Sequence, residues 1–167
     1  MSVVDVPVSE RPPVVAVVGS GEADPELEAI AERVGARVAG RGALLVCGGL
    51  GGVMAAACKG AKGAGGTTVG VLPGSDGSAA NAFVDVVVAT GLGEARNTVV
   101  VRSADVVVAV GGGYGTLSEI GFALKVGRPV VGLGTWELAR QGRRDEGVVT
   151  AAGPDEAVDT ALALAGA

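Results

Sequence analysis

The chain contains no histidine, and this absence excludes several kinds of chemistry. Nucleophilic systems that pair serine or cysteine with a histidine base are ruled out. Two cysteines, Cys47 and Cys58, are too few for a zinc site without histidine, so we expect no metal site. Both cysteines stand among apolar residues, and we expect them to pack as small core side chains.

Aromatic residues are scarce, and an excess of basic charge and long apolar runs are missing. Aromatics make up 2% of the 167 residues, so the core must be aliphatic. The net charge of −5 argues against a nucleic-acid partner. The chain has no run of about 18 apolar residues, which argues against a membrane span. Residues 1–13 carry acids and prolines instead of a cationic flank and an apolar stretch, so we expect no secretory signal and a cytoplasmic protein.

What the chain has in abundance is valine, alanine and glycine. Its 30 glycines lack a collagen-like period and fall directly after apolar runs such as Val14–Val18. Continuous valine runs, without polar alternation, are typical of buried parallel strands. Helical stretches between such strands indicate βαβ units. We therefore predict an α/β fold: a flexible tail over 1–13, then a single Rossmann-like doubly wound domain over 14–167, with a mainly parallel sheet of about six to seven strands and helices on both faces.

The predicted elements alternate along the chain. Asp24-Pro25 is typical of an N-cap followed by proline at the first helical position. Residues 134–147 are predicted to be a solvated loop. Strands are predicted at 14–18, 43–47, 67–72, 84–88, 105–110 and 129–133, and helices at about 25–39, 53–64, 94–103, 116–126 and from 154. In such sheets, ligands bind at the carboxyl ends of the strands, which is where the glycines fall.

The strongest motif is Gly111-Gly112-Gly113-Tyr114-Gly115-Thr116-Leu117-Ser118-Glu119, between a predicted strand and a helix. Glycines let the backbone fold closely around an anion, and the helix N-terminus adds unpaired donors and a positive dipole end. Thr116 offers its hydroxyl to the same phosphate. The motif is not a Walker sequence and does not have the dinucleotide spacing, so NAD is not the natural ligand.

A purely structural interpretation of this motif stays open. Thr116-x-x-Glu119 fits a capping box, in which Thr116 would be the N-cap and Glu119 would bond back to its N–H. Such a cap requires no ligand. The three consecutive glycines favour the phosphate interpretation, because a cap does not need them.

These residues resemble a known family. GGGYGTLSE is similar to the PGGxGTxxE signature of the LONELY GUY (LOG) superfamily, whose members often carry the label "possible lysine decarboxylase". The resemblance runs from about Val14 to Trp136 and is closest to the branch with molybdenum-cofactor carrier proteins. Matching segments are Gly19-Ser20-Gly21, Gly48-Gly49-Leu50-Gly51-Gly52-Val53-Met54, residues 65–74 and Glu94-Ala95-Arg96-Asn97.

The resemblance implies a doubly wound fold, homodimers or higher homo-oligomers, and phosphate held by the glycine turn. In the enzymatic branch, nucleoside 5′-monophosphates are cleaved to free base and ribose 5-phosphate by an arginine and a glutamate, which correspond to Arg96 and Glu119. Two positions depart from the family pattern: Gly111 replaces the leading proline, and Asn97 replaces a lysine. The missing lysine weakens the case for hydrolysis, whereas neither change damages the phosphate turn.

Decarboxylation through pyridoxal phosphate is rejected on chemical grounds. It needs a Schiff-base lysine with partners for the pyridine ring. Lys59, Lys62 and Lys125 stand in ordinary helical settings without such partners, so we expect them to be solvated.

Other residues allow two interpretations. The turn at 48–52 can form the ligand floor or let its helix pack closely, and Ser20 can bind ligand or serve the turn. The loop with Asp76 and Asn81 is more simply a plain loop. Trp136 is more often a packing residue at an edge or subunit contact, and the valine-rich face of 98–101 is an interface candidate.

The sequence therefore predicts a protein that binds a phosphate-bearing small ligand as a carrier or sensor. The ligand is a nucleotide or a pterin phosphate such as molybdenum cofactor, which would be cargo, since no resident cofactor is required. The alternative is a LOG-like phosphoribohydrolase with Arg96 and Glu119 as catalytic residues. The predicted phosphate- and ligand-binding residues are Gly19, Ser20, Gly21, Gly48, Gly49, Gly112, Gly113, Tyr114, Gly115 and Thr116.

Overall fold

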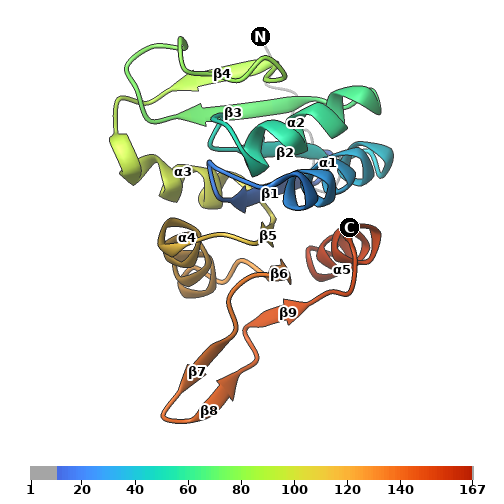
Figure 1. Ribbon diagram of the computed structural model, residues 1–167, viewed down its shortest axis with the longest axis vertical. Coiled ribbons are helices and arrows are strands. Elements are labelled where there is room, and N and C mark those ends of the chain that lie inside the picture. The colour runs from blue at the N-terminus through green and yellow to red at the C-terminus, as the bar shows by residue number, and fades with distance from the viewer. Residues whose placement is uncertain (1–10, 167) are drawn as a thin grey trace, which may run out of the picture.

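Seven strands pair side by side, all parallel, in the computed structural model, which describes residues 11–166 (Figure 1). Their order is β4-β3-β2-β1-β5-β6-β9. Register follows the valine runs: Val15 of β1 is opposite Leu45 on one side and Val106 on the other. The strands are β1 (Val14–Gly19), β2 (Leu44–Cys47), β3 (Thr68–Leu72), β4 (Val86–Ala89), β5 (Val106–Val110), β6 (Val130–Leu133) and β9 (Val148–Thr150).

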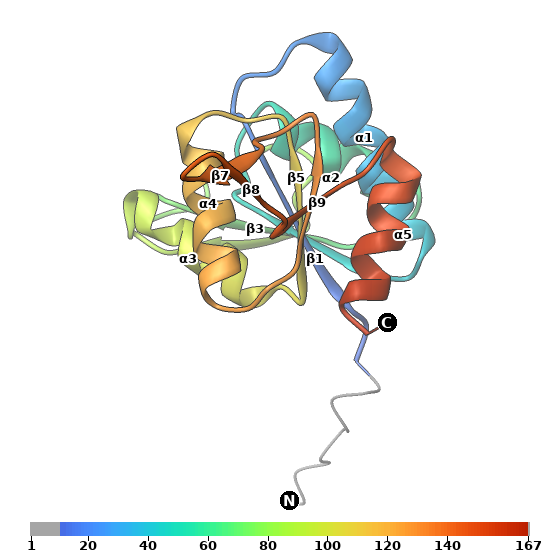
Figure 2. The same ribbon diagram turned by 90° about the horizontal axis from the view of Figure 1, so that it is seen from below.

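Helices cover both faces of this sheet. Valine and alanine side chains of α1, α2 and α5 pack on one face, and those of α3 and α4 pack on the other. Figure 2 shows α3 and α4 across the sheet from α1 and α5. The helices are α1 (Pro25–Gly40), α2 (Val53–Gly63), α3 (Arg96–Ser103), α4 (Tyr114–Lys125) and α5 (Pro154–Leu164), and a short 3₁₀ turn, η2 (Gly93–Ala95), leads into α3. The predicted α/β, doubly wound architecture is confirmed.

The direction in which strands are added reverses between β1 and β5. From β1 the chain adds β2, β3 and β4 toward one edge, and from β5 it adds β6 and β9 toward the other. The connections after β1 and β5 therefore leave on opposite faces of the sheet. Such a reversal opens a crevice at the carboxyl ends of the two central strands. The fold places the predicted glycine turns at these strand ends.

Helices α1 and α2 cross in very close contact. A Cβ added to Gly35 would lie 1.8 Å from the carbonyl oxygen of Ala57, and one added to Gly60 would lie 1.8 Å from that of Glu32. Only glycine fits at these two positions. The start of α1 is as predicted: Asp24 accepts a hydrogen bond from the amide of Leu27 at 2.8 Å, and Pro25 opens the helix.

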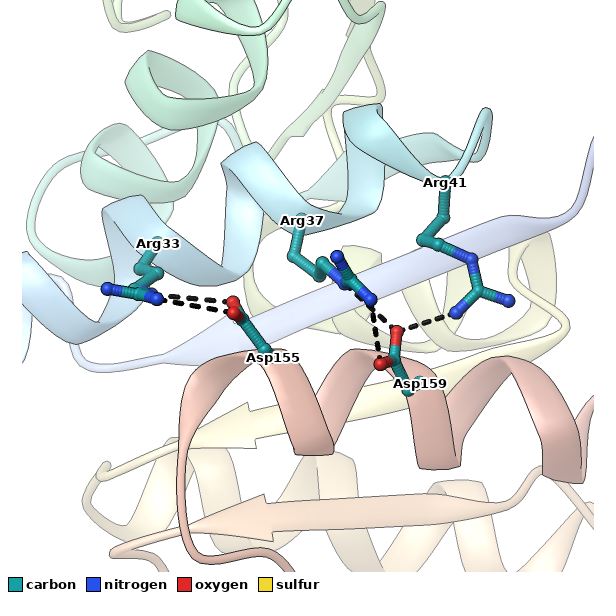
Figure 3. Close-up of polar contacts among 5 residues, drawn as sticks. All are labelled: Arg33, Arg37, Arg41, Asp155 and Asp159. Atoms are coloured by element: carbon teal, nitrogen blue, oxygen red, sulfur yellow. Dashed lines mark hydrogen bonds and ion pairs between the residues drawn. The ribbon is translucent and has the colours of Figure 1, made fainter.

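A seam of ion pairs joins α1 to α5 (Figure 3). Arg33 makes two bonds to Asp155, and Arg37 makes two to Asp159, the shorter at 2.8 Å. Arg41, directly after α1, reaches the same Asp159 carboxylate at 2.6 Å. The spacing of four residues places all three arginines on one side of the helix. The seam therefore ties the N-terminal half of the fold to its last helix.

Helix α4 begins three residues earlier than the capping box requires. Gly113 is the N-cap, no side chain caps the helix, and Thr116 lies in the first turn. The alternative interpretation with Thr116 as N-cap is therefore wrong, because three glycines in succession let the backbone enter the helix sooner. The Thr116 side chain instead packs against the α-carbon of Gly112 and is buried.

Residues 134–147 were predicted to be a loop, but most of them form a hairpin. Strands β7 (Leu138–Arg140) and β8 (Arg143–Asp145) pair antiparallel. The two residues between them, Gln141 and Gly142, have φ of 52° and 77°. Two positive φ values in a two-residue loop match the twist of a hairpin. Gln-Gly is a weaker signal for this turn than Asn-Gly, which explains why the sequence pattern did not reveal it.

Several smaller predictions fall on particular residues. Residues 1–10 of the predicted tail lie outside the described residues, whereas Arg11 pairs with Asp105 at 2.8 Å. Val100 and Val101, from the proposed interface face, are fully buried in the core, so that proposal is wrong. Within residues 11–166, no helix has both the length and the apolar character that crossing a membrane requires.

Candidate functional site

Three glycine turns meet at the carboxyl ends of β1, β2 and β5. The amide of Val53 donates to the carbonyl of Ser20 at 3.0 Å, which links the first turn to the second. A Cβ on Gly19 would lie 2.6 Å from the carbonyl oxygen of Val110, which places the first turn against the end of β5. The glycines at these junctions let three backbone segments approach within van der Waals distance.

The turn after β5 leaves a row of backbone donors unpaired. Gly111 and Gly112 have φ of 55° and 101°, values that favour glycine. The next amide with a backbone acceptor after that of Gly111 is Leu117, which donates to Gly113 at 3.0 Å. Within residues 11–166, the amides of 112–116 have no protein acceptor. They stand at the positive end of α4, the arrangement that favours an anion.

Two side chains that follow β6 hold this turn in place. The hydroxyl of Thr135 donates to the carbonyl of Gly111 at 2.5 Å, and the indole N–H of Trp136 donates to that of Gly113 at 3.0 Å. The ring of Tyr114 lies 5.6 Å from that of Trp136, centroid to centroid, tilted by 32°. Sequence reasoning had given Trp136 only a packing role, since its distance of 23 residues from Gly113 hides the contact.

Arg96 and Glu119 line one small cavity beside the turn. Arg96 opens α3, and Glu119 lies in the second turn of α4, on the same face of the sheet. The cavity holds about 60 Å³, roughly two water molecules. It is lined by Val17, Val18, Gly19, Gly48, Met54, Arg96 and Glu119. Four of the predicted site residues are therefore brought together, although they come from four separate segments.

The guanidinium of Arg96 is buried with part of its bonding capacity unused. Arg96 is 8% exposed. It donates to the carbonyl of Gly48 at 3.4 Å and to the side-chain oxygen of Asn97, but its Nε has no partner within residues 11–166. A Cβ on Gly48 would lie 2.7 Å from Nη2 of Arg96, so glycine makes room for the cation. A buried donor without a partner is unusual and suits a ligand acceptor.

The cavity shifts the acidity of both side chains. Burial raises the pKa of the Glu119 carboxyl to about 7, and the nearby charge of Arg96 opposes that rise. Burial likewise lowers the pKa of Arg96, opposed by the charge of Glu119. A carboxyl that titrates near neutral pH is suited to accepting or donating a proton.

The turn after β2 is held by a side chain from the loop between β3 and β4. Asn81 donates to the carbonyls of Leu50 at 2.9 Å and Gly49 at 3.2 Å. Asn81 was expected to belong to a plain loop, but it anchors this turn. Beneath it, the Sγ atoms of Cys47 and Cys58 lie 3.5 Å apart, both free and buried, as expected for core cysteines.

The remaining predicted residues lie around the cavity without lining it. The hydroxyl of Ser20 accepts the amide of Glu22 at 3.1 Å, which is the role of a turn residue. Gly49 is buried within the second turn, and Gly21 is exposed at the first. Tyr114 and Gly115 are exposed in the amide row itself.

Known proteins are similar to this chain in sequence or in fold. An uncharacterized protein of Archaeoglobus fulgidus is 50% identical over 119 residues, 71% of this chain and 78% of that protein. The structure of the molybdenum cofactor binding protein from the phototrophic bacterium Rippkaea orientalis is 36% identical, with a TM-score of 0.84 over 93% of this chain and 98% of that one. The molybdenum cofactor carrier protein of Chlamydomonas reinhardtii is 38% identical, with a TM-score of 0.83 over 94% and 100% of the two chains.

These comparisons confirm the predicted resemblance at the level of family and fold. A family model described as the SLOG cluster4 family matches residues 12–158. That range includes all three glycine turns, Arg96 and Glu119. The chain belongs to the SLOG cluster4 family.

Proposed function

We propose that this protein binds a phosphate-bearing small ligand at the turn 112–116 and acts as a carrier or sensor. The observation that carries the proposal is the row of unpaired amides at the start of α4, and the unused Nε of Arg96 is a second buried donor without a partner. Hydrogen bonds to charged oxygens contribute about 1.5–3 kcal/mol each. The helix dipole adds about 0.3–1 kcal/mol, rising to about 2 when partly buried. The amides therefore supply most of the anchoring.

Molybdenum cofactor, a pterin phosphate, is the cargo that the relatives favour. Two similar structures, each covering more than nine-tenths of this chain, are described as a molybdenum cofactor binding protein and a molybdenum cofactor carrier protein. A nucleotide offers the same phosphate to the same turn. The phosphate is thus the shared element of the ligand, and the ring is what distinguishes the two.

Hydrolysis of a nucleoside 5′-monophosphate is the second candidate, and the state of Glu119 favours it. A carboxyl with a pKa of about 7 can take a proton from water at neutral pH. The water oxygen would then bond to C1′ of the ribose, and the base would leave with the electron pair of the N-glycosidic bond and a proton. Arg96 would stabilise negative charge on phosphate or leaving base. The asparagine beside Arg96, where LOG enzymes have lysine, weighs against this candidate.

A matched pair of variants at position 114 tests the amide row. Tyr114→Pro removes one N–H at the first helical position, which proline favours, and Gly113 before it is already extended. Tyr114→Ala removes the same ring but keeps the N–H. We expect ribose 5-phosphate, measured by isothermal titration calorimetry, to bind Tyr114→Pro about tenfold or more weakly than Tyr114→Ala. Equal affinities would contradict the proposal.

Base release distinguishes the two candidates. Wild-type protein incubated with a panel of nucleoside monophosphates, followed by chromatography, should show binding without free base. Free base that disappears in Glu119→Gln would instead establish the hydrolase. Leu164→Ala, an exposed change on α5 across the sheet, is the control for unspecific effects.

We also propose that the protein forms homo-oligomers through the edge strand β4. All four residues of β4 are exposed, and Val86, Val87 and Val88 are 40–48% exposed. Phe83 and Leu92 add apolar surface beside them. An apolar edge strand left bare invites pairing with another chain, and a second copy of β4 would cover it.

A further inference from the structure

The single tyrosine and the single tryptophan of the chain lie against each other at the phosphate turn. Only four of the 167 residues are aromatic. Tyr114 belongs to the row of free amides, and Trp136 donates its indole N–H to the carbonyl of Gly113, one residue away. Two of the four aromatic rings therefore meet at a turn whose amides are unpaired.

The Tyr114 ring contacts Trp136 on one side and is exposed to solvent on the other. The ring centroids lie 5.6 Å apart at a tilt of 32°, within the range of aromatic pairs that attract each other. The bond from Trp136 to Gly113 fixes the indole relative to the turn. Tyr114 is nevertheless 82% exposed, so Trp136 covers only a small part of its ring. The Tyr114 ring thus lies against a hydrogen-bonded indole at the turn, with most of its own surface free.

We infer that Tyr114 and Trp136 form a stacking platform for the planar nitrogen heterocycle of the ligand whose phosphate the turn binds. The inference rests on the proposed function, because it takes the phosphate as the anchor. A ring joined to that phosphate by a short linker lies within reach of Tyr114, since the amide of Tyr114 is itself one of the anchoring donors. Both a nucleobase and a pterin have such a ring.

The platform offers a place for the heterocycle of the ligand, which the cavity at Arg96 and Glu119 does not. With about 60 Å³ that cavity cannot enclose a heterocycle and a sugar. Aromatic stacking tolerates any flat ring, because every base has a π-face. The platform therefore selects a planar ring attached to a phosphate over a phosphate alone, and it does not choose among planar rings.

Fluorescence of Trp136 gives a direct test, because it is the only tryptophan. The probes are ribose 5-phosphate, which has no ring, adenosine monophosphate and neopterin monophosphate. We expect the two ring-bearing probes to bind wild-type protein at least tenfold more tightly than ribose 5-phosphate and to quench the tryptophan. Tyr114→Ala should bring the affinity ratio of ring-bearing probe to ribose 5-phosphate close to one, and Tyr114→Phe should keep it at tenfold or more.

The possible failures can be told apart. If ribose 5-phosphate binds but the ring adds no affinity, or if Tyr114→Ala keeps the preference, the platform is overturned and the phosphate site stands. If Tyr114→Ala lowers the mass of an oligomer in light scattering and leaves the preference unchanged, a second copy covers the rings, and the platform is again overturned. If wild-type protein binds none of the probes, the proposed function fails and the platform fails with it. Circular dichroism of each variant checks that this exposed substitution leaves the fold intact.

Discussion

Glu119 carries a carboxyl group whose ionisation opposes folding. Its pKa rises from an ordinary 4.5 to about 7 in the folded chain, chiefly through burial. An acid with a raised folded pKa binds more protons when folded, so the free energy of unfolding falls as pH rises from about 4.5 to 7. The interval between the two pKa values corresponds to about 3 kcal/mol. The residue proposed to act in the site therefore weakens the fold at neutral pH.

Replacing this carboxyl by an amide should remove the penalty. At pH 8, we expect the free energy of unfolding of Glu119→Gln to exceed that of wild type by about 2–3 kcal/mol. At pH 4, where Glu119 is protonated, the two free energies should be equal. Urea titrations between pH 4 and pH 8 measure this. A difference that is constant across that range would show that the carboxyl titrates normally.

Gly112 and Gly113 stand side by side but tolerate a methyl group differently. At Gly112, φ is 101° and an added Cβ would lie 2.3 Å from Oγ1 of Thr116. At Gly113, φ is −101° and nothing lies within 4 Å. We expect Gly112→Ala to cost about 2–4 kcal/mol of stability from strain and overpacking, and Gly113→Ala to cost less than about 1 kcal/mol. Chemical denaturation of both variants checks this, and equal losses would contradict it.

The sequence indicated which residues are candidates for the site but not how they are arranged. Arg96 and Glu119 were expected from the resemblance, and the glycine turn from its own pattern. The approach of Arg96 to Gly48 and of Trp136 to Gly113 depends on how distant segments pack, which local pattern does not encode. The pKa of Glu119 has the same origin, because burial arises only when α3 and α4 lie together on the sheet.

At the scale of elements, the contact between α1 and α2 depends on two glycines. Gly60→Ala would drive a Cβ into the carbonyl of Glu32, and backbone cannot move aside as a side chain can. We expect a loss of at least about 3 kcal/mol. Gly63, at the end of the same helix, has nothing within 4 Å, so Gly63→Ala should be neutral or stabilise by up to about 1 kcal/mol. Thermal unfolding of the two variants measures the contrast, which would vanish if the helices were free to separate.

The seam between α1 and α5 should respond to pH and salt. Hydrogen bonds from Arg37 hold the pKa of Asp159 below its ordinary value. The ion pairs of Asp159 therefore contribute to the free energy of unfolding above about pH 4, and this contribution is lost as pH falls further. Asp159→Asn should therefore lower the melting temperature at pH 7 more than Asp155→Asn, because Asp159 pairs with two arginines. Both effects should shrink in 1 M salt, which screens exposed charges. Differential scanning calorimetry at two salt concentrations decides it.

The predictions of strands and helix starts are correct where a valine run or the Asp24-Pro25 cap marks the element. They are wrong where the backbone conformation of glycines sets the start of a helix or a turn. The strands of the central sheet up to β6 and the cap at Asp24 follow directly from the sequence pattern. The start of α4 and the hairpin β7–β8 depend on φ values that glycine permits but does not require. A glycine in a sequence marks freedom of the backbone, and only tertiary packing shows how that freedom is used.

For the whole molecule, the two edges of the sheet differ in a way that favours β4 for the proposed association of copies. Strand β9 at one edge has one buried and two exposed residues, and Val149 is 37% exposed. At the other edge, every residue of β4 is exposed, so neither face of that strand is covered by a helix. Burial of apolar surface contributes about 25 cal/mol of favourable free energy per Å². This contribution favours association through β4.

A charge placed on that strand should separate the copies without unfolding them. Val86 is 48% exposed, and a lysine there would have to be desolvated in a paired edge. We expect wild-type protein to show the mass of a dimer or larger assembly in light scattering, and Val86→Lys to show a smaller mass at the same concentration. Leu164→Lys is the matched control, since Leu164 is equally exposed at 47% but lies on α5, away from the edge. A monomeric wild type, or an unchanged mass for Val86→Lys, would place the apolar edge outside any interface between copies.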